Sequence, residues 1–299
     1  MNKVFRSGFI GVIGRPNVGK STLFNAIIGE KISITANKPQ TTRNKITGIK
    51  NLPGAQLIFL DTPGIHKATT PMNRIMVKTA KDTFGDADIL LMLVDAHSSV
   101  HPQDMFLIEA LAGIKLPVFL VINKIDLIEK QMLLPLIDKF RNLYNYAEII
   151  PVSAITGEGV ERLLEIIKDN LPEGPQYFAE EEFTDASERF IAAEFIREQI
   201  MLLTAQEIPY ATAVEIDSFK EDEATNLIRI SATITVEKDS QKAIMIGKKG
   251  LMLKKIGTQA RLEMEKLFGA KVFLKLFVRV RKDWTSSEKM LEEFGLIKN

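Results

Sequence analysis

The chain has 299 residues, of which 45% are hydrophobic and 26% are charged, a composition typical of a soluble globular protein with room for two domains. It has no Cys, which excludes disulfide bonds and cysteine zinc sites, and no apolar run reaches the ~18 residues that a membrane helix needs. The first apolar run, residues 9–13, is too short for a secretory signal, so a cytoplasmic protein is predicted.

The net charge of +1 conceals two oppositely charged segments. Residues 179–223 contain 13 acidic and 3 basic residues, whereas residues 238–282 contain 13 basic and 3 acidic residues. A basic segment of this kind is typical of a surface that meets a polyanion, although two solvated faces that bind nothing would have the same composition.

The first part of the chain, to about residue 170, alternates short apolar runs with helical patterns. Continuous apolar runs favour buried strands of a parallel sheet, and their alternation with helices favours a doubly wound α/β domain with a mostly parallel sheet. Polar clusters follow the runs, as expected if ligands bind beyond the carboxyl ends of the strands. The predicted strands are residues 9–13, 57–60, 89–94, 118–122 and 149–152.

The pattern changes after the Leu-Pro-Glu-Gly-Pro segment at residues 171–175. We therefore place a first domain at residues 1–172, a linker at 173–186 and a second, α+β domain at 187–299. Residues 227–236 alternate apolar and polar side chains, as a strand with one wet face does. The elements predicted for the second domain are a helix at 187–204, strands at 211–219 and 227–236, helices at 241–246 and 251–268, and a strand at 272–280.

A phosphate-binding loop is predicted at residues 14–21, where Gly-Arg-Pro-Asn-Val-Gly-Lys-Ser matches the pattern G-x-x-x-x-G-K-[ST]. The loop follows an apolar strand and opens a helix, so its backbone N–H groups and the helix N-terminus would converge on phosphate oxygens. We expect Lys20 to reach the β- and γ-phosphates and the Ser21 hydroxyl to bind Mg²⁺. The residues predicted to bind nucleotide here are Asn17, Val18, Gly19, Lys20, Ser21 and Thr22.

The sequence Asn-Lys-Ile-Asp at residues 123–126 predicts that the nucleotide base is guanine. The Asp126 carboxylate can accept hydrogen bonds from guanine N1–H and the 2-amino group, and adenine offers neither donor. We expect Asn123 to join this loop to the phosphate-binding loop and the Lys124 stem to pack on the base. After the next strand, Ser153 and Ala154 are predicted to supply a backbone N–H to guanine O6.

Two further loops are predicted to sense the γ-phosphate. Asp61 ends a strand within Asp-Thr-Pro-Gly, where it suits a water-mediated contact to Mg²⁺, and the Gly64 N–H can reach the γ-phosphate. Thr42 is the predicted second hydroxyl ligand of Mg²⁺, with Thr41 as the alternative. The predicted metal ligands are therefore Ser21, Thr42 and Asp61, and the residues predicted to act in hydrolysis are Lys20, Thr42 and Gly64.

The three histidines, His66, His97 and His101, lack the spacing of metal ligands, and Mg²⁺ prefers oxygen. A zinc or general-base role is therefore disfavoured. His66 follows the Asp-Thr-Pro-Gly motif closely enough to contact nucleotide or a partner.

A glycine loop at residues 247–250, Gly-Lys-Lys-Gly, separates two predicted helices of the basic segment. Such a loop is often only a helix–helix turn, but within an α-β-β-α-α-β order it resembles the loop with which type II KH domains clamp about four nucleotides of single-stranded RNA. The residues predicted to contact RNA are Gly247, Lys248, Lys249, Gly250, Lys254 and Lys255, and Arg261 extends the positive surface.

Phe273 and Phe277 share one face of the last predicted strand with Lys275. Either they are stacking platforms for bases, or they pack beneath a C-terminal helix that contains Trp284. We favour the packing interpretation for the two phenylalanines.

The motifs at residues 14–21, 40–43 and 61–64 resemble those of the Era and TrmE group of translation-factor-related GTPases, and a GTPase domain followed by a KH domain is the architecture of the Era family. The resemblance implies a GTP-hydrolysing switch that binds the 3′ end of 16S rRNA and acts in assembly of the 30S ribosomal subunit. It also implies cytoplasmic residence with peripheral association at the inner membrane face. The sequence shows no dimerisation signal, which favours a monomer.

One departure from Ras-like proteins is that Ile65 stands where they carry the glutamine that orients the attacking water. The Era family has a hydrophobic residue there, which implies slow intrinsic hydrolysis. Asn17 matches an asparagine that supports a K⁺ ion near the phosphates in some relatives.

Two other interpretations remain open. A signalling GTPase would use the second domain to bind an acidic protein. A small-molecule phosphotransferase would use the same phosphate-binding loop, but it would leave residues 123–126 unexplained.

Overall fold

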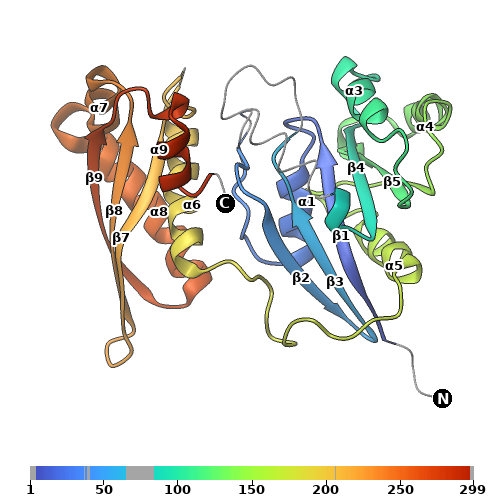
Figure 1. Ribbon diagram of the computed structural model, residues 1–299, viewed down its shortest axis with the longest axis horizontal. Helices are drawn as coiled ribbons and strands as arrows, with labels where there is room; N and C mark the ends of the chain where they lie inside the picture. Colours follow the sequence, from blue (N-terminus) through green and yellow to red (C-terminus); the bar gives the residue numbers. More distant parts are fainter. Residues whose placement is uncertain (1–4, 37, 39–40, 65–83, 206, 297–299) are drawn as a thin grey trace. The chain divides into compact units, whose positions relative to one another are not determined.

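The computed structural model describes residues 5–36, 38, 41–64, 84–205 and 207–296 (Figure 1). The chain forms two compact units. Among the described residues, the first unit contains 5–33, 42–64 and 84–185, and the second contains 34–41 and 186–296.

The first unit is built on a sheet whose strand order is β2-β3-β1-β4-β5-β6. All neighbouring pairs are parallel except β2 with β3, which are antiparallel. The predicted doubly wound, mostly parallel α/β fold is therefore confirmed. The strands are β1 (Arg6–Gly14), β2 (Ile46–Leu52), β3 (Ala55–Asp61), β4 (Ile89–Asp95), β5 (Val118–Asn123) and β6 (Glu148–Pro151).

Helices pack against this sheet because its strands are apolar on both faces. Leu107 of α3 and Phe140 of α4 share one buried cluster with side chains of β4 and β5, while α1 contacts β1, β2 and β3, and α5 contacts β3. The helices are α1 (Lys20–Ile28), α3 (Pro102–Ala110), α4 (Leu133–Arg141) and α5 (Val160–Asn170), with 3₁₀ turns η1 (Ile125–Leu127) and η2 (Lys130–Met132).

Strand β2 was not among the predicted strands. It carries Gly48, Lys50 and Asn51, which weaken the apolar signal of a buried strand. Its partner β3 is fully buried and follows after only two residues, so the two form a hairpin.

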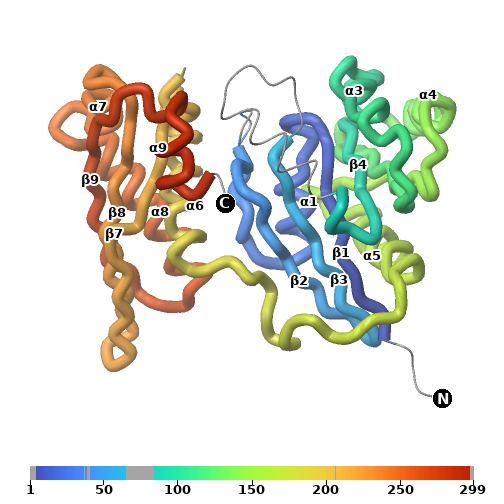
Figure 2. The backbone as a smooth tube through the Cα atoms, viewed as in Figure 1, coloured from blue at the N-terminus to red at the C-terminus, as the bar shows by residue number. Residues whose placement is uncertain are grey.

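The segment predicted as a linker lies along the edge of the first unit's sheet, and Figure 2 traces it between α5 and α6. The Gln56 side chain accepts hydrogen bonds from the N–H groups of Tyr177 (2.8 Å) and Phe178 (3.0 Å) and donates to the Phe178 carbonyl (2.9 Å). Ile49 of β2 donates its N–H to the Phe183 carbonyl at 2.9 Å. These bonds attach residues 177–183 to the first unit.

The second unit has a sheet of order β7-β8-β9, in which β7 and β8 are antiparallel and β8 and β9 are parallel. The α6 and α8 helices contact one another, β7 and β9, so they cover one face of the sheet. The predicted α+β order is confirmed. The elements are α6 (Glu188–Leu203), β7 (Ala213–Asp222), β8 (Leu227–Val236), α7 (Asp239–Ile246), η3 (Lys248–Gly250), α8 (Leu251–Phe268), β9 (Lys271–Val280), η4 (Trp284–Ser286) and α9 (Glu288–Glu293).

The predicted packing of Phe273 and Phe277 beneath the C-terminal helix is wrong. These rings are 55% and 45% exposed. The fully buried Trp284 donates from Nε1 to the Ala211 carbonyl at 3.1 Å, and its ring meets Phe294 edge to face with centroids 5.0 Å apart. Phe294, which comes after α9, therefore fills the contact that was predicted for the phenylalanines of β9.

Within the described part of the chain, no helix has the length and apolar character needed to cross a membrane.

Replacing Gln56 with Leu tests the attachment of residues 177–183. The N–H groups of Tyr177 and Phe178 lose their acceptor, so we expect the first unit to be destabilised by about 1–3 kcal/mol. Urea unfolding followed by circular dichroism measures this loss. The single Trp, Trp284, lies in the second unit, so its fluorescence transition is expected to stay unchanged. The exposed Gln131→Leu is the control, and equal losses in both variants would contradict the prediction.

Candidate functional site

The predicted phosphate-binding loop connects β1 to α1 at the carboxyl end of the sheet. Gly19 precedes the helix with φ +94°, and a Cβ at this position would lie 2.3 Å from the Asn123 amide nitrogen. Only glycine fits this conformation and this approach. The first backbone N–H groups of α1 are therefore presented at the loop, where an anion would bind.

Lys20 is buried, with 7% of its surface exposed. Its Nζ donates to the carbonyls of Gly14 (3.1 Å) and Arg15 (3.0 Å). Burial lowers the pKa of Lys20 to about 8, and the nearby Asp61 carboxylate offsets part of that effect. A phosphate oxygen bound at the loop would place a negative charge beside this ammonium group and stabilise its charged form.

Three hydroxyl groups surround the fully buried Asp61. Oδ2 of Asp61 accepts from Ser33 Oγ (2.7 Å), Ser21 Oγ (2.9 Å) and Thr42 Oγ1 (3.5 Å), and the Ser21 and Thr42 oxygens lie 3.0 Å apart. Burial raises the pKa of Asp61, while the hydrogen bonds and the Lys20 charge act in the opposite direction. The other oxygen, Oδ1, has no hydrogen-bond partner in the described part of the chain.

This set of hard oxygen atoms fits Mg²⁺, which binds through carboxylates, hydroxyls and retained waters. The structure brings together the three side chains that were predicted as its ligands, Ser21, Thr42 and Asp61. Thr41, the alternative, points elsewhere, because its hydroxyl donates to the carbonyls of Lys38 (2.7 Å) and Ala36 (3.3 Å).

Ser33 was missed by the sequence analysis. It has no exposed surface, and its position is fixed by Asn25, which accepts from the Ser33 N–H (3.0 Å) and donates to its carbonyl (2.6 Å). Ser33 belongs to no recognisable sequence motif, so its role becomes apparent only from the packing of its loop against α1.

Gly64 lies beside the phosphate-binding loop, since a Cβ there would be 3.2 Å from Lys20 Nζ. Ile65 and His66, which bear on the predicted hydrolysis rate and on contacts with nucleotide, lie outside the described residues.

The loops predicted to bind the base meet at the ends of β5 and β6. Asn123 is buried and donates to the Val18 carbonyl at 2.9 Å. Its Oδ1 accepts from the N–H groups of Lys124 (2.8 Å) and Ala154 (3.0 Å). One side chain thus ties together the phosphate-binding loop and both base loops.

The carboxylate of Asp126 is exposed and is oriented by the buried Ser153, whose hydroxyl donates to Oδ1 at 2.6 Å. Lys124 Nζ donates to the Asn17 carbonyl (2.8 Å) and pairs with Asp95 Oδ2 (2.7 Å). Asp95, at the end of β4, was not predicted to take part in the site. Its position at the carboxyl end of a central strand was the available signal.

The two described histidines do not form a metal site. His101 caps the N-terminus of α3, where Nδ1 accepts from the Gln103 N–H at 3.1 Å. Among the described residues, no metal-ion site is formed by three or more His, Cys, Asp or Glu side chains.

The glycine loop of the second unit connects α7 to α8. Gly247 has φ +70°, and a Cβ there would lie 2.7 Å from the Met252 Cβ, so a side chain is excluded. Lys248 and Lys249 are both exposed, and Lys249 adopts a left-handed conformation with φ +52°. The turn therefore projects two lysines into solvent from a closely packed backbone.

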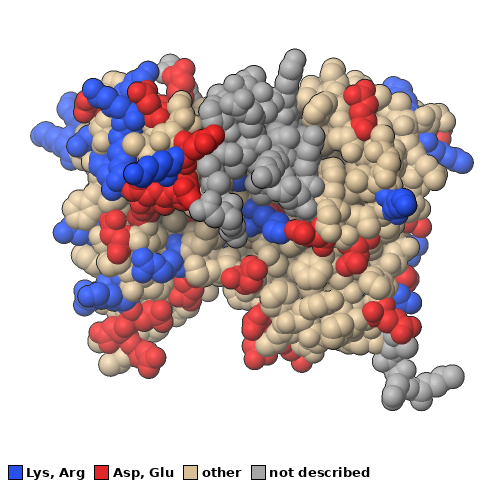
Figure 3. Space-filling model, viewed as in Figure 1, with Lys and Arg blue, Asp and Glu red and all other residues tan. Residues whose placement is uncertain are grey.

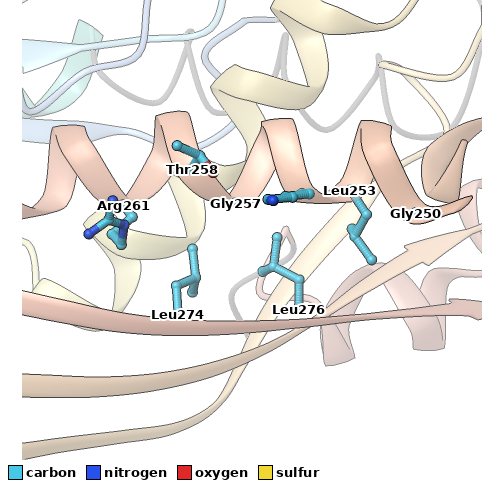
Figure 4. A pocket seen from close by; sticks show the side chains of 8 residues that line it. Gly250, Leu253, Gly257, Thr258, Arg261, Leu274 and Leu276 are labelled. Atoms are coloured by element: carbon cyan, nitrogen blue, oxygen red, sulfur yellow. The ribbon is translucent and has the colours of Figure 1, made fainter.

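A groove of about 300 Å³ runs from this loop between α8 and β9. Figure 4 shows Leu274 and Leu276 of β9 pointing toward the helix, with Arg261 at one end of the groove. Lys254 also lines it, whereas Lys255 is exposed on α8 but is not among the lining residues. An apolar floor with basic residues along its wall is suited to bases below and phosphates above.

The charges of the second unit are unevenly distributed, although acidic side chains also lie beside the basic ones in Figure 3. In Figure 3, Lys and Arg gather around α7 and the end of β9 near it, whereas Asp and Glu gather at the tip of the β7–β8 hairpin. The basic part of the sequence thus forms a surface beside the glycine loop.

Comparison with known proteins agrees with this geometry. Residues 9–124 match the family described as 50S ribosome-binding GTPase, and residues 207–285 match the KH domain family. The chain is 63% identical to GTPase Era of Syntrophus aciditrophicus over 98% of this chain and 95% of that protein. It is 58% identical to GTPase Era of Geobacter metallireducens over 97% and 98% of the two chains.

The chain belongs to the Era family of GTPases. Two Era crystal structures are similar over 98% of this chain and 100% of theirs, each with a TM-score of 0.93 and 39% identity. One is a single-residue variant of Aquifex aeolicus Era bound to GDP·AlF4⁻, and the other is Era in complex with MgGDPNP and nucleotides 1506–1542 of 16S ribosomal RNA. Like other Era proteins, this chain is a P-loop GTPase that hydrolyses GTP, with a KH domain after its G domain.

Nucleotide binding is expected to take up protons near pH 8. Because the pKa of Lys20 is about 8, part of this lysine is neutral there, and a phosphate beside it raises the pKa. Calorimetric titration of GDP in buffers of different ionisation enthalpy measures the uptake. It should approach zero at pH 6, where Lys20 is already protonated. Equal proton uptake at pH 6 and pH 8 would contradict this assignment.

Asp126→Asn is expected to shift preference from guanine toward xanthine nucleotides. The amide cannot accept from both guanine donors, whereas xanthine presents a carbonyl to the new N–H group. Competition binding with GDP and XDP measures the change, which we expect to be at least about tenfold in the ratio of affinities. Glu129→Gln, an exposed carboxylate in a neighbouring turn, is the control and should leave the ratio unchanged.

Proposed function

We propose that this chain is a GTP-controlled RNA-binding switch that binds the 3′ end of 16S rRNA through its KH domain and acts in maturation of the 30S ribosomal subunit. The observation that carries the proposal is the groove between α8 and β9, with Lys248 and Lys249 directly before Gly250, which lines its mouth. The similar Era structure that holds nucleotides 1506–1542 of 16S ribosomal RNA supports it.

The nucleotide would be held by its phosphates and its base at separate loops. Lys20 and the backbone N–H groups of residues 17–22 would hold the phosphates, while Asp126, Ser153 and Ala154 would select guanine. The Ala154 N–H donates to Asn123 Oδ1 in this structure. A hydrogen bond from the same N–H to guanine O6 would either replace this bond or share the donor with it.

The metal ion would be Mg²⁺, bound by Ser21 and Thr42 and, through water, by Asp61. When bound, Mg²⁺ neutralises charge on the β- and γ-phosphates. The Gly64 N–H would hold the γ-phosphate, so its loss on hydrolysis would release both Thr42 and Gly64. The conformation of the two loops would thus depend on whether GTP or GDP is bound.

Several finer points belong to the same proposal. Asn17, an exposed residue of the phosphate-binding loop, would support a K⁺ ion, as the matching asparagine does in some relatives. Cytoplasmic residence and peripheral association with the membrane follow from the family resemblance, and a monomeric state is proposed because the sequence shows no dimerisation signal. The proposed domain boundaries at residues 172 and 187 come from the change in sequence pattern, and the division of the two compact units between Asp185 and Ala186 lies near the second of them.

The RNA assignment is tested with the double variant Lys248→Glu/Lys249→Glu. Two lysines at the mouth of the groove become repulsive to phosphate, so we expect RNA affinity to fall by at least about tenfold and the salt dependence of binding to weaken. Fluorescence anisotropy with labelled RNA of nucleotides 1506–1542 at several salt concentrations measures both effects.

A double variant with the same charge change outside the groove, Lys266→Glu/Lys282→Glu, is the control. If both double variants lose RNA affinity equally, only the net charge matters and the groove assignment fails. If neither loses affinity, the KH domain does not bind this RNA, and a protein partner becomes the better interpretation.

A further inference from the structure

Ser33 is the hydroxyl residue closest to the Asp61 carboxylate. Its Oγ lies 2.7 Å from Asp61 Oδ2, compared with 2.9 Å for Ser21 Oγ and 3.5 Å for Thr42 Oγ1. Ser33 has no exposed surface, and within the described part of the chain its hydroxyl donates to Asp61 alone. It is thus the most deeply buried of the three hydroxyl residues around this carboxylate.

The other two hydroxyls have a second task. Ser21 Oγ and Thr42 Oγ1 lie 3.0 Å apart, and both are assigned to the metal ion. Thr42 is at the limit of a hydrogen bond to Asp61, and it would be released when the γ-phosphate is lost. Ser33 does not belong to this pair, so its hydrogen bond to Asp61 does not compete with metal binding.

The backbone at Ser33 is fixed by Asn25 of α1. Asn25 Oδ1 accepts from the N–H groups of Ile32 (3.1 Å) and Ser33 (3.0 Å), and Asn25 Nδ2 donates to the Ser33 carbonyl (2.6 Å). Asn25 follows Ser21 by about one helical turn, so a single helix places both hydroxyls. The position of the Ser33 hydroxyl therefore depends on α1 and not on a bound nucleotide.

Fixing one oxygen of Asp61 determines where the other one points. The torsion that turns an Asp carboxylate is broad, so a carboxylate without a firm partner can rotate. Oδ2 accepts all three hydroxyl hydrogen bonds, whereas the buried Oδ1 has no hydrogen-bond partner in the described part of the chain. An acceptor of this kind can receive a hydrogen bond from a water molecule that Mg²⁺ retains.

We propose that Ser33 is a positioning residue for the metal site, because it holds Asp61 Oδ2 in every nucleotide state and so keeps Oδ1 available for a water of Mg²⁺. The inference rests on the proposed Mg²⁺ site and deepens it. Ser33 acts through Asp61 and does not itself bind the ion. Loss of its hydroxyl should therefore weaken Mg²⁺ binding whether GDP or GTP is present.

The experiment measures nucleotide affinity against Mg²⁺ concentration. Fluorescently labelled GDP and a non-hydrolysable GTP analogue are titrated with each variant, in EDTA and over a series of Mg²⁺ concentrations. For Ser33→Ala, affinity in EDTA should stay unchanged, whereas the Mg²⁺ concentration at half effect should rise by at least about tenfold for both nucleotides. Thr42→Ala should raise this concentration for the GTP analogue only, because Thr42 is held beside a γ-phosphate.

Ser7→Ala is the matched control. Ser7 is a buried serine of the same unit, near the end of β1 away from the phosphate-binding loop, and its hydroxyl donates to the Pro175 carbonyl at 2.6 Å. Its replacement removes a buried hydroxyl and should lower stability toward urea. It should leave the Mg²⁺ dependence of nucleotide binding unchanged, which separates a general loss of stability from a loss of positioning.

The inference is overturned if Ser33→Ala has the Mg²⁺ dependence of the unmodified protein, or if it loses affinity equally with and without Mg²⁺. If Ser33→Ala does not fold, Asn25→Ala decides, since it frees the Ser33 backbone but keeps the hydroxyl. This variant should need more Mg²⁺ than the unmodified protein, and a normal requirement would overturn the inference. Failure of the proposed Mg²⁺ site is distinguishable, because Mg²⁺ would then not strengthen nucleotide binding even in the unmodified protein.

Discussion

The buried carboxylate of Asp61 is the constraint on which the nucleotide site depends. Its Oδ2 accepts hydrogen bonds from the hydroxyls of Ser21 in helix α1 and of Ser33 and Thr42 in two separate loops, and Lys20 lies close enough to affect its pKa. A carboxylate removed from water is costly unless hydrogen bonds or a cation compensate it. Mg²⁺ and phosphate would complete that compensation. The protein without nucleotide therefore already has its polar groups in position for both.

Much of the fold and of the nucleotide site could be predicted because both are encoded locally. The phosphate-binding loop and the Asn-Lys-Ile-Asp motif each require their residues at fixed spacing, and the alternation at residues 227–236 marks strand β8 directly. Ser33 could not be predicted, because its role comes from packing between distant segments. Asp95 was missed although it ends a central strand, because its pairing with Lys124 joins two distant segments. Phe273 was predicted wrongly, since an alternating strand does not reveal whether its second face is covered.

The second unit presents its candidate ligand-binding residues differently from the first. The G domain holds Lys20, Asp61 and Asn123 of its nucleotide site in buried positions, whereas the KH domain presents Lys248 and Lys249 on a turn whose backbone packs closely at Gly247. A long, flexible polyanion is held by many weak contacts along a surface, and each contact is sensitive to salt. The two units thus combine a site with buried polar groups and a site with exposed basic groups.

Residues 177–183, which Gln56 attaches to the first unit, also cover an edge of its sheet. β2 is the outermost strand of the first sheet, and an outer strand with unpaired N–H and C=O groups is a template for pairing with other chains. Ile49 donates to Phe183, and Asn51 donates through its side chain to Glu180, so this rim is occupied by the protein's own backbone. The connection between the domains therefore also covers the β2 edge of the G-domain sheet.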